Sequence, residues 1–203
     1  MERIFEHEGT KYVRINKHLA APFNDVNDNG VPIIKSESED FINEHGVPSK
    51  RIKVNCLTIS PASINPNMAS GIYNRFKANL MNKECDLEAD TIKVALVNNS
   101  HSFTATHNGY SDISANELAA TGGYTTGGAA LASKAVTQAA TTKFDAADTS
   151  WTSATFTAYH AVIYDDTLAG DDLIASIDFG GAQAVSSGTF TIQWHADGII
   201  TLA

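Results

Sequence analysis

The chain has 203 residues, with 14 Lys and Arg against 23 Asp and Glu, and its net charge is −9 at pH 7. This length predicts one large domain or two small ones. The acidic balance argues against binding to nucleic acid or to an anionic membrane surface. Because no apolar run reaches about 18 residues, we expect no membrane-spanning helix, and the charged start of the chain predicts no secretion signal.

The first elements along the chain are expected to be a hairpin and a loop. Apolar residues 4–5 and 12–15 flank the turn-like pair Glu8-Gly9, a pattern that predicts two paired strands. Residues 22–32 are rich in Asn, Asp, Gly and Pro and predict a loop.

A short helix is predicted over residues 36–45, since Ser36 can cap its start and Gly46 follows its end. Phe41 and Ile42 would face inward. Residues 51–59 alternate as a strand does. Residues 60–70, with two prolines, read as a linker, so we place a boundary near Met68. The chain is thus divided into a small α+β segment or arm, 1–67, and a β-rich domain, 68–203. Their net charges are −1 and −8.

The second part begins with a predicted helix and strand. Ile72, Phe76 and Leu80 recur every four residues, which gives one apolar helical face. An acidic turn follows, and the β-branched run 91–97 predicts a strand.

Beyond residue 100 the sequence favours strands and loops. Residues 98–110 predict a polar loop. The glycine pairs on either side of Tyr124 predict irregular backbone, in a flexible turn with Tyr124 as its aromatic anchor. Residues 131–137 predict a strand, with a helix over the Ala-rich 129–140 as the alternative. In 151–165 two alternating apolar sets are out of phase, so we expect a change of face near Tyr159-His160.

Three short strands are predicted to complete the chain, at 173–179, 189–194 and 199–202, with Phe190 and Ile192 inward. Short strands at regular spacing are typical of all-β domains. The expected fold is mainly β: an antiparallel sandwich or barrel-like domain with one short helix at its start.

Two acidic clusters are candidates for cation binding. Residues 25–30 (DVNDNG) resemble the start of an EF-hand loop, but Ser36 stands where a bidentate Glu is needed, so an Asn/Asp turn is the simpler interpretation. Asp165-Asp166 and Asp171-Asp172 lie in a predicted hairpin connection. They would hold a divalent ion or act as an acid/base pair, or they would keep the loop solvated.

Catalytic signatures are absent from the sequence. It has no HExxH, GxSxG or phosphate loop. His101 and His107 share a loop, while His160 and His195 are expected to pack in strands. Cys56 and Cys85 form no CxxC pair and are interpreted as reduced structural cysteines. We therefore predict no catalytic, cofactor-binding or metal-binding residue and no enzymatic activity.

Four segments in fixed order resemble one family: IYNRFKANLMN, DLEADTIKVALV, TGGYTTGGAAL and the long C-terminal stretch from YHAVIYDD to HADGIITL. Over residues 68–203 the chain is similar to a family of tailed-bacteriophage virion structural proteins. The resemblance implies a particle component, expected as a capsid decoration or cement protein on the outer surface of the phage head. Its expected partners are the major capsid protein and further copies of itself as a homotrimer, with no nucleic acid and no membrane.

Two alternatives stay open. A tail or fibre protein that binds a host receptor or glycan would use exposed Tyr110 and Tyr124 for stacking on sugars. A depolymerase would need a carboxylate pair, for which Asp165 or Asp166 with Asp178 are the nearest candidates.

Overall fold

The computed structural model describes residues 70–202 throughout and, before them, the strand residues 4–7, 10–16, 19–22, 37–42, 48–53 and 57–59. Two compact units make up the chain, Met1–Lys35 and Ser36–Ala203. The predicted loop at 22–32, its calcium-type residues 25–30 and the predicted boundary near Met68 lie outside the described residues.

The smaller unit contains a three-stranded antiparallel sheet. Its strands β1 (Ile4–His7), β2 (Thr10–Asn16) and β3 (Leu19–Pro22) follow one another in chain order. In the β1–β2 ladder, Ile4 pairs with Val13 and His7 with Thr10. The predicted N-terminal hairpin is therefore confirmed.

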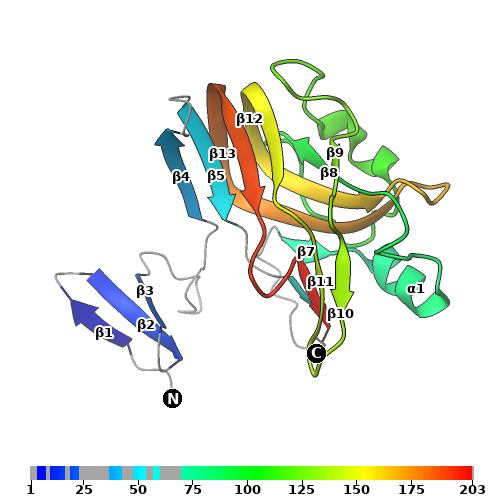
Figure 1. Ribbon diagram of the computed structural model, residues 1–203, viewed down its shortest axis with the longest axis horizontal. Helices are drawn as coiled ribbons and strands as arrows, with labels where there is room; N and C mark the ends of the chain where they lie inside the picture. The colour runs from blue at the N-terminus through cyan, green and yellow to red at the C-terminus, as the bar shows by residue number, and fades with distance from the viewer. Residues whose placement is uncertain are drawn as a thin grey trace. The chain divides into compact units, whose positions relative to one another are not determined.

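A seven-stranded sheet dominates the larger unit, in the order β4-β5-β13-β12-β8-β9, with β7 (Gly71–Ile72) paired to β13. Its centre is an antiparallel pair of long strands, β12 (Thr149–Asp165) and β13 (Asp172–Gln193), which curve side by side in Figure 1. β8 (Ile92–Val97) and β9 (Ala129–Ala130) extend one side. On the other side, β5 (Pro48–Lys53) runs parallel to β13 and antiparallel to β4 (Glu37–Ile42).

The helix predicted over residues 36–45 is wrong, because the described part of this segment, residues 37–42, forms strand β4. Its ladder pairs Phe41 with Ser49 and Glu37 with Lys53. Backbone pairing to β5 satisfies every second N–H and C=O of the segment, and this tertiary gain outweighs a local capping pattern that is worth about 1 kcal/mol.

A second, four-stranded sheet has the order β10-β11-β14-β6. It comprises β10 (Ala135–Thr137), β11 (Thr142–Asp145), β14 (Ile200–Leu202) and β6 (Leu57–Ile59). Buried residues of both sheets, among them Phe144 and Ile200 from this one, share a single core. The described strands do not close into a barrel, and the mainly β prediction is confirmed. The alternative helix over 129–140 is not formed, since β9 and β10 occupy this segment.

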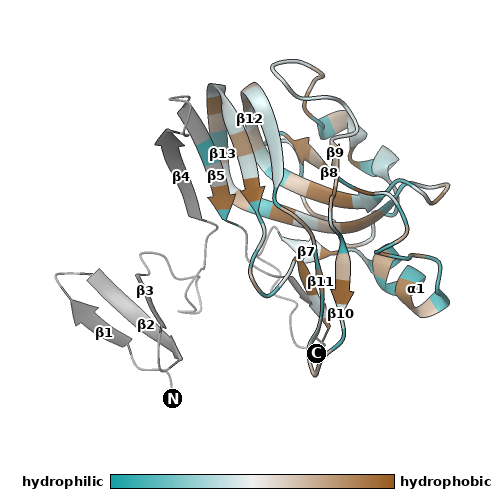
Figure 2. Ribbon diagram, in the orientation of Figure 1, coloured by the Kyte–Doolittle hydropathy of each residue, from teal (hydrophilic) through white to brown (hydrophobic). Residues whose placement is uncertain are grey.

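The long strand β12 changes face where the sequence predicted it. The ladder with β13 shifts register between Ala158 and His160. Beyond this point β12 also pairs with β8, and both faces are covered: Ala161 and Ile163 belong to one buried cluster, Val162 and Tyr164 to another. Figure 2 shows hydrophobic and more hydrophilic residues interleaved along β12 and β13. An inserted residue is what a period-two pleat requires to change phase.

Strand β13 joins two segments that the sequence predicted as separate strands. Gly180 and Gly181, with φ of 75° and 146°, lie inside it and do not end it. Phe190 and Ile192 are fully buried, while Thr189 and Thr191 are partly exposed, as predicted.

The single described α-helix, α1 (Asn74–Asn82), packs on β13 with Phe76 buried and Leu80 half-buried. It ends at Lys83, whose φ of 60° is left-handed. The apolar spacing of Ile72, Phe76 and Leu80 predicted this helix, although Ile72 itself lies in β7. None of the described helices has the length and apolar character that a membrane crossing requires.

Candidate functional site

A groove lies between α1, the turn that follows it, and the four-stranded sheet. Its volume is about 460 Å³, and the chain segments 76–88, 136–144 and 200–202 line it. Phe76, Leu80 and Leu87 form its apolar wall on one side, with Phe144 and Ile200 on the other. Lys83, Lys143, Asp86 and Glu88 add charges of both signs.

Two exposed large hydrophobic side chains lie at this groove. Among the described residues the exposed large hydrophobic side chains are Met81, Leu202 and Val136, with 86%, 51% and 40% of their surface exposed. Val136 and Leu202 line the groove, whereas Met81, on α1, does not. Exposed apolar groups gathered in one place mark an interaction surface more often than isolated ones do. We call this groove the apolar groove.

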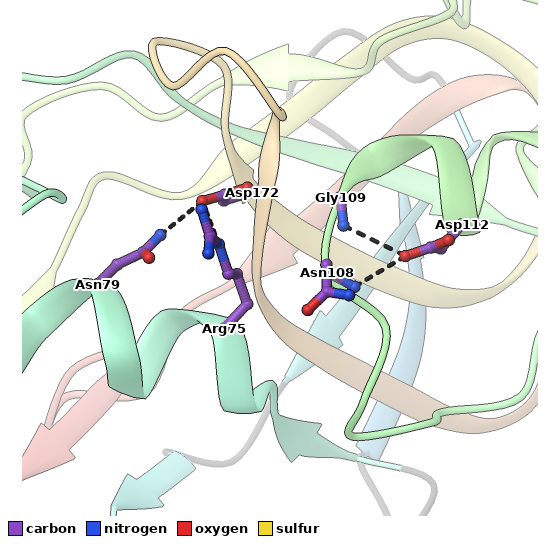
Figure 3. Close-up of polar contacts among 6 residues, drawn as sticks. All are labelled: Arg75, Asn79, Asn108, Gly109, Asp112 and Asp172. Atoms are coloured by element: carbon purple, nitrogen blue, oxygen red, sulfur yellow. Dashed lines mark hydrogen bonds and ion pairs between the residues drawn. The ribbon is translucent and has the colours of Figure 1, made fainter.

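A buried carboxylate anchors α1 to the start of β13. Asp172 is 5% exposed, and its Oδ2 accepts hydrogen bonds from Arg75 Nε and from Asn79 Nδ2, each at 2.7 Å (Figure 3). The Arg75 contact is also an ion pair. Asp172 therefore fixes the helix against the sheet, and its charge has partners from two turns of α1.

The loop that approaches Asp172 from the other side is held by a second carboxylate. Asp112 Oδ2 accepts backbone N–H bonds from Asn108 at 2.8 Å and Gly109 at 3.3 Å (Figure 3). These two donors hold the pKa of Asp112 below its usual value. Gly109 forms a β-bridge with Asp172, so the loop 98–110 is pinned to the hairpin.

The four hairpin aspartates have different environments. Asp166 forms an ion pair with Lys93 at 2.7 Å, and both side chains are partly exposed. The expectation that all four keep a loop solvated is wrong for Asp165 and Asp172, which are 1% and 5% exposed. Folding brings them together as a directly opposed pair at the end of the β12–β13 ladder.

The carboxylate pair of the depolymerase alternative is not assembled. Asp178 lies opposite His160 in the β12–β13 ladder, while Asp165 lies opposite Asp172. Positions 160 and 165 are therefore five residues apart along one strand, a span of about 16 Å. That separation is too large for a pair acting on one glycosidic bond.

Two histidines distant in sequence meet in the interior. The rings of His101 and His160 lie 5.1 Å apart edge to face, and His101 Nε2 is 3.1 Å from Ser176 Oγ. Burial lowers the pKa of both, that of His101 to about 4, and each ring therefore stays neutral at pH 7. Packing was predicted for His160 and is confirmed. The same prediction is wrong for His195, which follows the end of β13 and is exposed.

Glu117 organises the glycine-rich turn, although no sequence pattern marked it. Its Oε1 accepts hydrogen bonds from Tyr124 Oη at 2.6 Å and from Gly127 N–H at 2.7 Å, and Oε2 accepts one from Tyr110. Tyr124 also accepts the N–H of Leu96 and is only 3% exposed. Tyr124 is thus the predicted anchor of the turn, and its predicted exposure for sugar stacking is wrong.

Among the described residues, one group of side chains has the composition of a metal site. Cys85, Asp90 and Asp165 place one potential ligand atom each within 4.8 Å of one another. Cys85 also lines the apolar groove. Sequence spacing gave no indication of this group, because its members come from three separate elements.

The chain was compared with known proteins at three levels: no family model matches it, and neither does any curated protein or solved structure.

Proposed function

We propose that the chain is a bacteriophage virion structural protein that binds the outside of the head shell as a decoration or cement protein. The observation that carries the proposal is the packing of the four family-like segments, residues 72–82, 86–97, 121–131 and 159–202. They are separated in sequence, yet they lie against one another in one unit.

Direct contacts join each of these segments to at least one of the others. Arg75 of the first bonds Asp172 of the fourth. Strand β8 in the second pairs with β12 in the fourth and donates the Leu96 N–H to Tyr124 in the third. Tyr164 Oη in turn donates to Gly127 O at 2.7 Å. The residues that carry the resemblance thus form one packed unit. This packing supports a shared fold over a chance similarity of four short sequence segments.

Charge and surface chemistry are consistent with an outer position. A net charge of −8 on residues 68–203 repels packaged nucleic acid. The apolar groove offers exposed Val136 and Leu202 beside charges of both signs, the mixture found at protein interfaces. The partner we assign to it is the major capsid protein, and we propose that copies of the chain associate as a homotrimer on the shell.

The test is cryo-electron microscopy and mass spectrometry of particles of the phage that encodes the chain. Density on the outer head lattice, with the apolar groove against the capsid protein, is the expected result. Density on the tail alone would replace decoration with a tail or receptor-binding role, and absence from the particle would overturn a virion role.

A variant series tests the attachment face. Val136→Glu and Leu202→Glu each place a charge in the proposed contact, and we expect about tenfold weaker binding to undecorated heads. Ser102→Glu is the matched control, since Ser102 is exposed in a loop and does not line the groove. Equal binding by all three variants would show that another face contacts the shell.

A further inference from the structure

Three elements bring a thiol and two carboxylates together beside the apolar groove. Cys85 lies in the turn after α1, Asp90 lies two residues before β8, and Asp165 ends β12. The ladder between β12 and β8 pairs Asp165 with Ile92, which places the end of one strand beside the entry to the other. One ligand atom from each of the three residues lies within 4.8 Å of those from the other two.

Backbone donors hold both carboxylates in place. Asp90 Oδ2 accepts the N–H of Asp86 at 2.6 Å, and Asp165 Oδ1 accepts the N–H of Thr167 at 3.0 Å. Lys134 donates to the backbone oxygen of Asp90, and this contact fixes the turn. Each carboxylate is thus oriented by one of its oxygens.

The second oxygen of Asp165, Oδ2, has no hydrogen-bond partner among the described residues. This oxygen is buried, and Asp165 as a whole is 1% exposed. A buried carboxylate oxygen without a partner costs free energy, and native proteins rarely leave one so. Its environment contains a second carboxylate and a thiol, the arrangement expected where a cation completes the site.

We propose that Cys85, Asp90 and Asp165 bind a divalent transition-metal ion, with Zn²⁺ the best match. Zinc accepts thiolate and carboxylate ligands together, whereas Ca²⁺ and Mg²⁺ bind oxygen alone. Tetrahedral zinc with these ligands would space the donor atoms about 3.5 Å apart, whereas they now lie within 4.8 Å of one another, so the group needs a contraction of at most about 1.3 Å. Water from the groove side supplies the fourth ligand, since Cys85 is half-exposed there.

The ion would join the C-terminal side of α1 to β8 and β12. An ion that binds the folded chain and not the unfolded one stabilises the folded chain by mass action. The consequence is a firmer wall on one side of the apolar groove.

The experiment uses the full chain, stripped with a chelator and titrated with ZnCl₂ by calorimetry and thermal unfolding. We expect about one ion per chain and a rise in Tm of about 5–10 °C at a hundredfold excess over Kd. With Co²⁺ as the probe, a thiolate-to-metal charge-transfer band should appear.

Two variants and two controls assign the ligands. Cys85→Ser should abolish the Co²⁺ band and Asp165→Asn should weaken Zn²⁺ binding at least tenfold, while Cys56→Ser and Asp166→Asn keep both. Asp165→Asn retains the acceptor for Thr167 and removes the unpaired charge, so its metal-free Tm should equal or exceed that of the metal-free wild type. Loss of the zinc response then reflects a lost ligand and not a lost fold.

Two results would overturn the proposal. One is a wild-type chain that shows neither binding heat nor a Tm shift with Zn²⁺. The other is zinc binding of equal strength in Cys85→Ser and Asp165→Asn, which would place the ion elsewhere, for example on the chain's histidines.

Discussion

Phe190 lies at the centre of an aromatic cluster, and its truncation to alanine should be among the most damaging single changes in the larger unit. The side chain is fully buried on β13. Its ring centroid lies 5.2 Å from that of Phe156, 6.0 Å from Trp151 and 6.1 Å from Phe179. All three separations fall within the range of favourable aromatic pairs.

The magnitude follows from burial and from these contacts. Removing a fully buried Phe side chain costs about 3–5 kcal/mol. Each aromatic pair adds about 0.5–1.5 kcal/mol beyond burial. We therefore expect Phe190→Ala to lower the free energy of unfolding by about 4–5 kcal/mol, the upper half of that range. A domain of ordinary stability would then be left with a small margin.

Urea unfolding followed by tryptophan fluorescence measures this loss. Trp151 and Trp194 are each 6% exposed, so their emission reports the state of the core. Thr191→Ala is the matched control: it lies next to Phe190 on the opposite face and bonds Ser150 through its hydroxyl at 2.8 Å. The control should cost less than about 1 kcal/mol. A loss below that value for Phe190→Ala would refute the assigned facing of β13.

Two further changes test the buried polar contacts. Asn79→Ala removes a donor to the buried Asp172 carboxylate and should lower the free energy of unfolding, measured in urea, by about 2 kcal/mol. The control Lys77→Ala, at an exposed position on the same helix, should lower it by less than about 0.5 kcal/mol. Equal losses would contradict the anchoring role of Asp172. The depressed pKa of His101, about 4, predicts acid sensitivity, because the unfolded chain binds a proton near pH 6.5 that the folded chain excludes. The ring of His101 lies near His160, His107, Asp178 and Ser176. Its contribution to the free energy of unfolding is complete above about pH 6.5 and decreases as the pH is lowered, by roughly 2 kcal/mol at pH 5. His101→Gln should therefore show a smaller loss of stability between pH 7 and pH 5 than wild type, and an unchanged pH dependence would show that His101 does not carry it.

A local sequence pattern was sufficient to predict those elements whose own residues show the periodicity of a helix or a strand. The four-residue apolar spacing predicted α1, and the β-branched run at 91–97 predicted β8. The change of face in β12 was predictable because two apolar sets out of phase demand an extra residue in a period-two strand. The same reasoning placed Phe190 and Ile192 inward.

Pattern failed where pairing with a distant strand decided the outcome. Residues 37–42 have helix-like flanking residues, but β5 supplies a partner and they form β4. The sequence predicted separate strands at 173–179 and 189–194, yet β13 spans Asp172–Gln193 and continues through Gly180 and Gly181. Tyr124 was placed correctly as an anchor, while its burial depended on Glu117, which no local spacing identifies.

The amino-acid order alone was enough to predict the mainly β class, helix α1 beside strand β8 and the acidic charge balance, because periodicity and charge are properties of short stretches. Which polar groups meet depends on the three-dimensional fold. Asp172 reaches Arg75 across 97 positions, and His101 meets His160 across 59. Cys85 and Asp90 meet Asp165 only because β8 pairs with the end of β12. Contacts between such distant positions depend on strand register and helix docking, and no spacing along the chain encodes them.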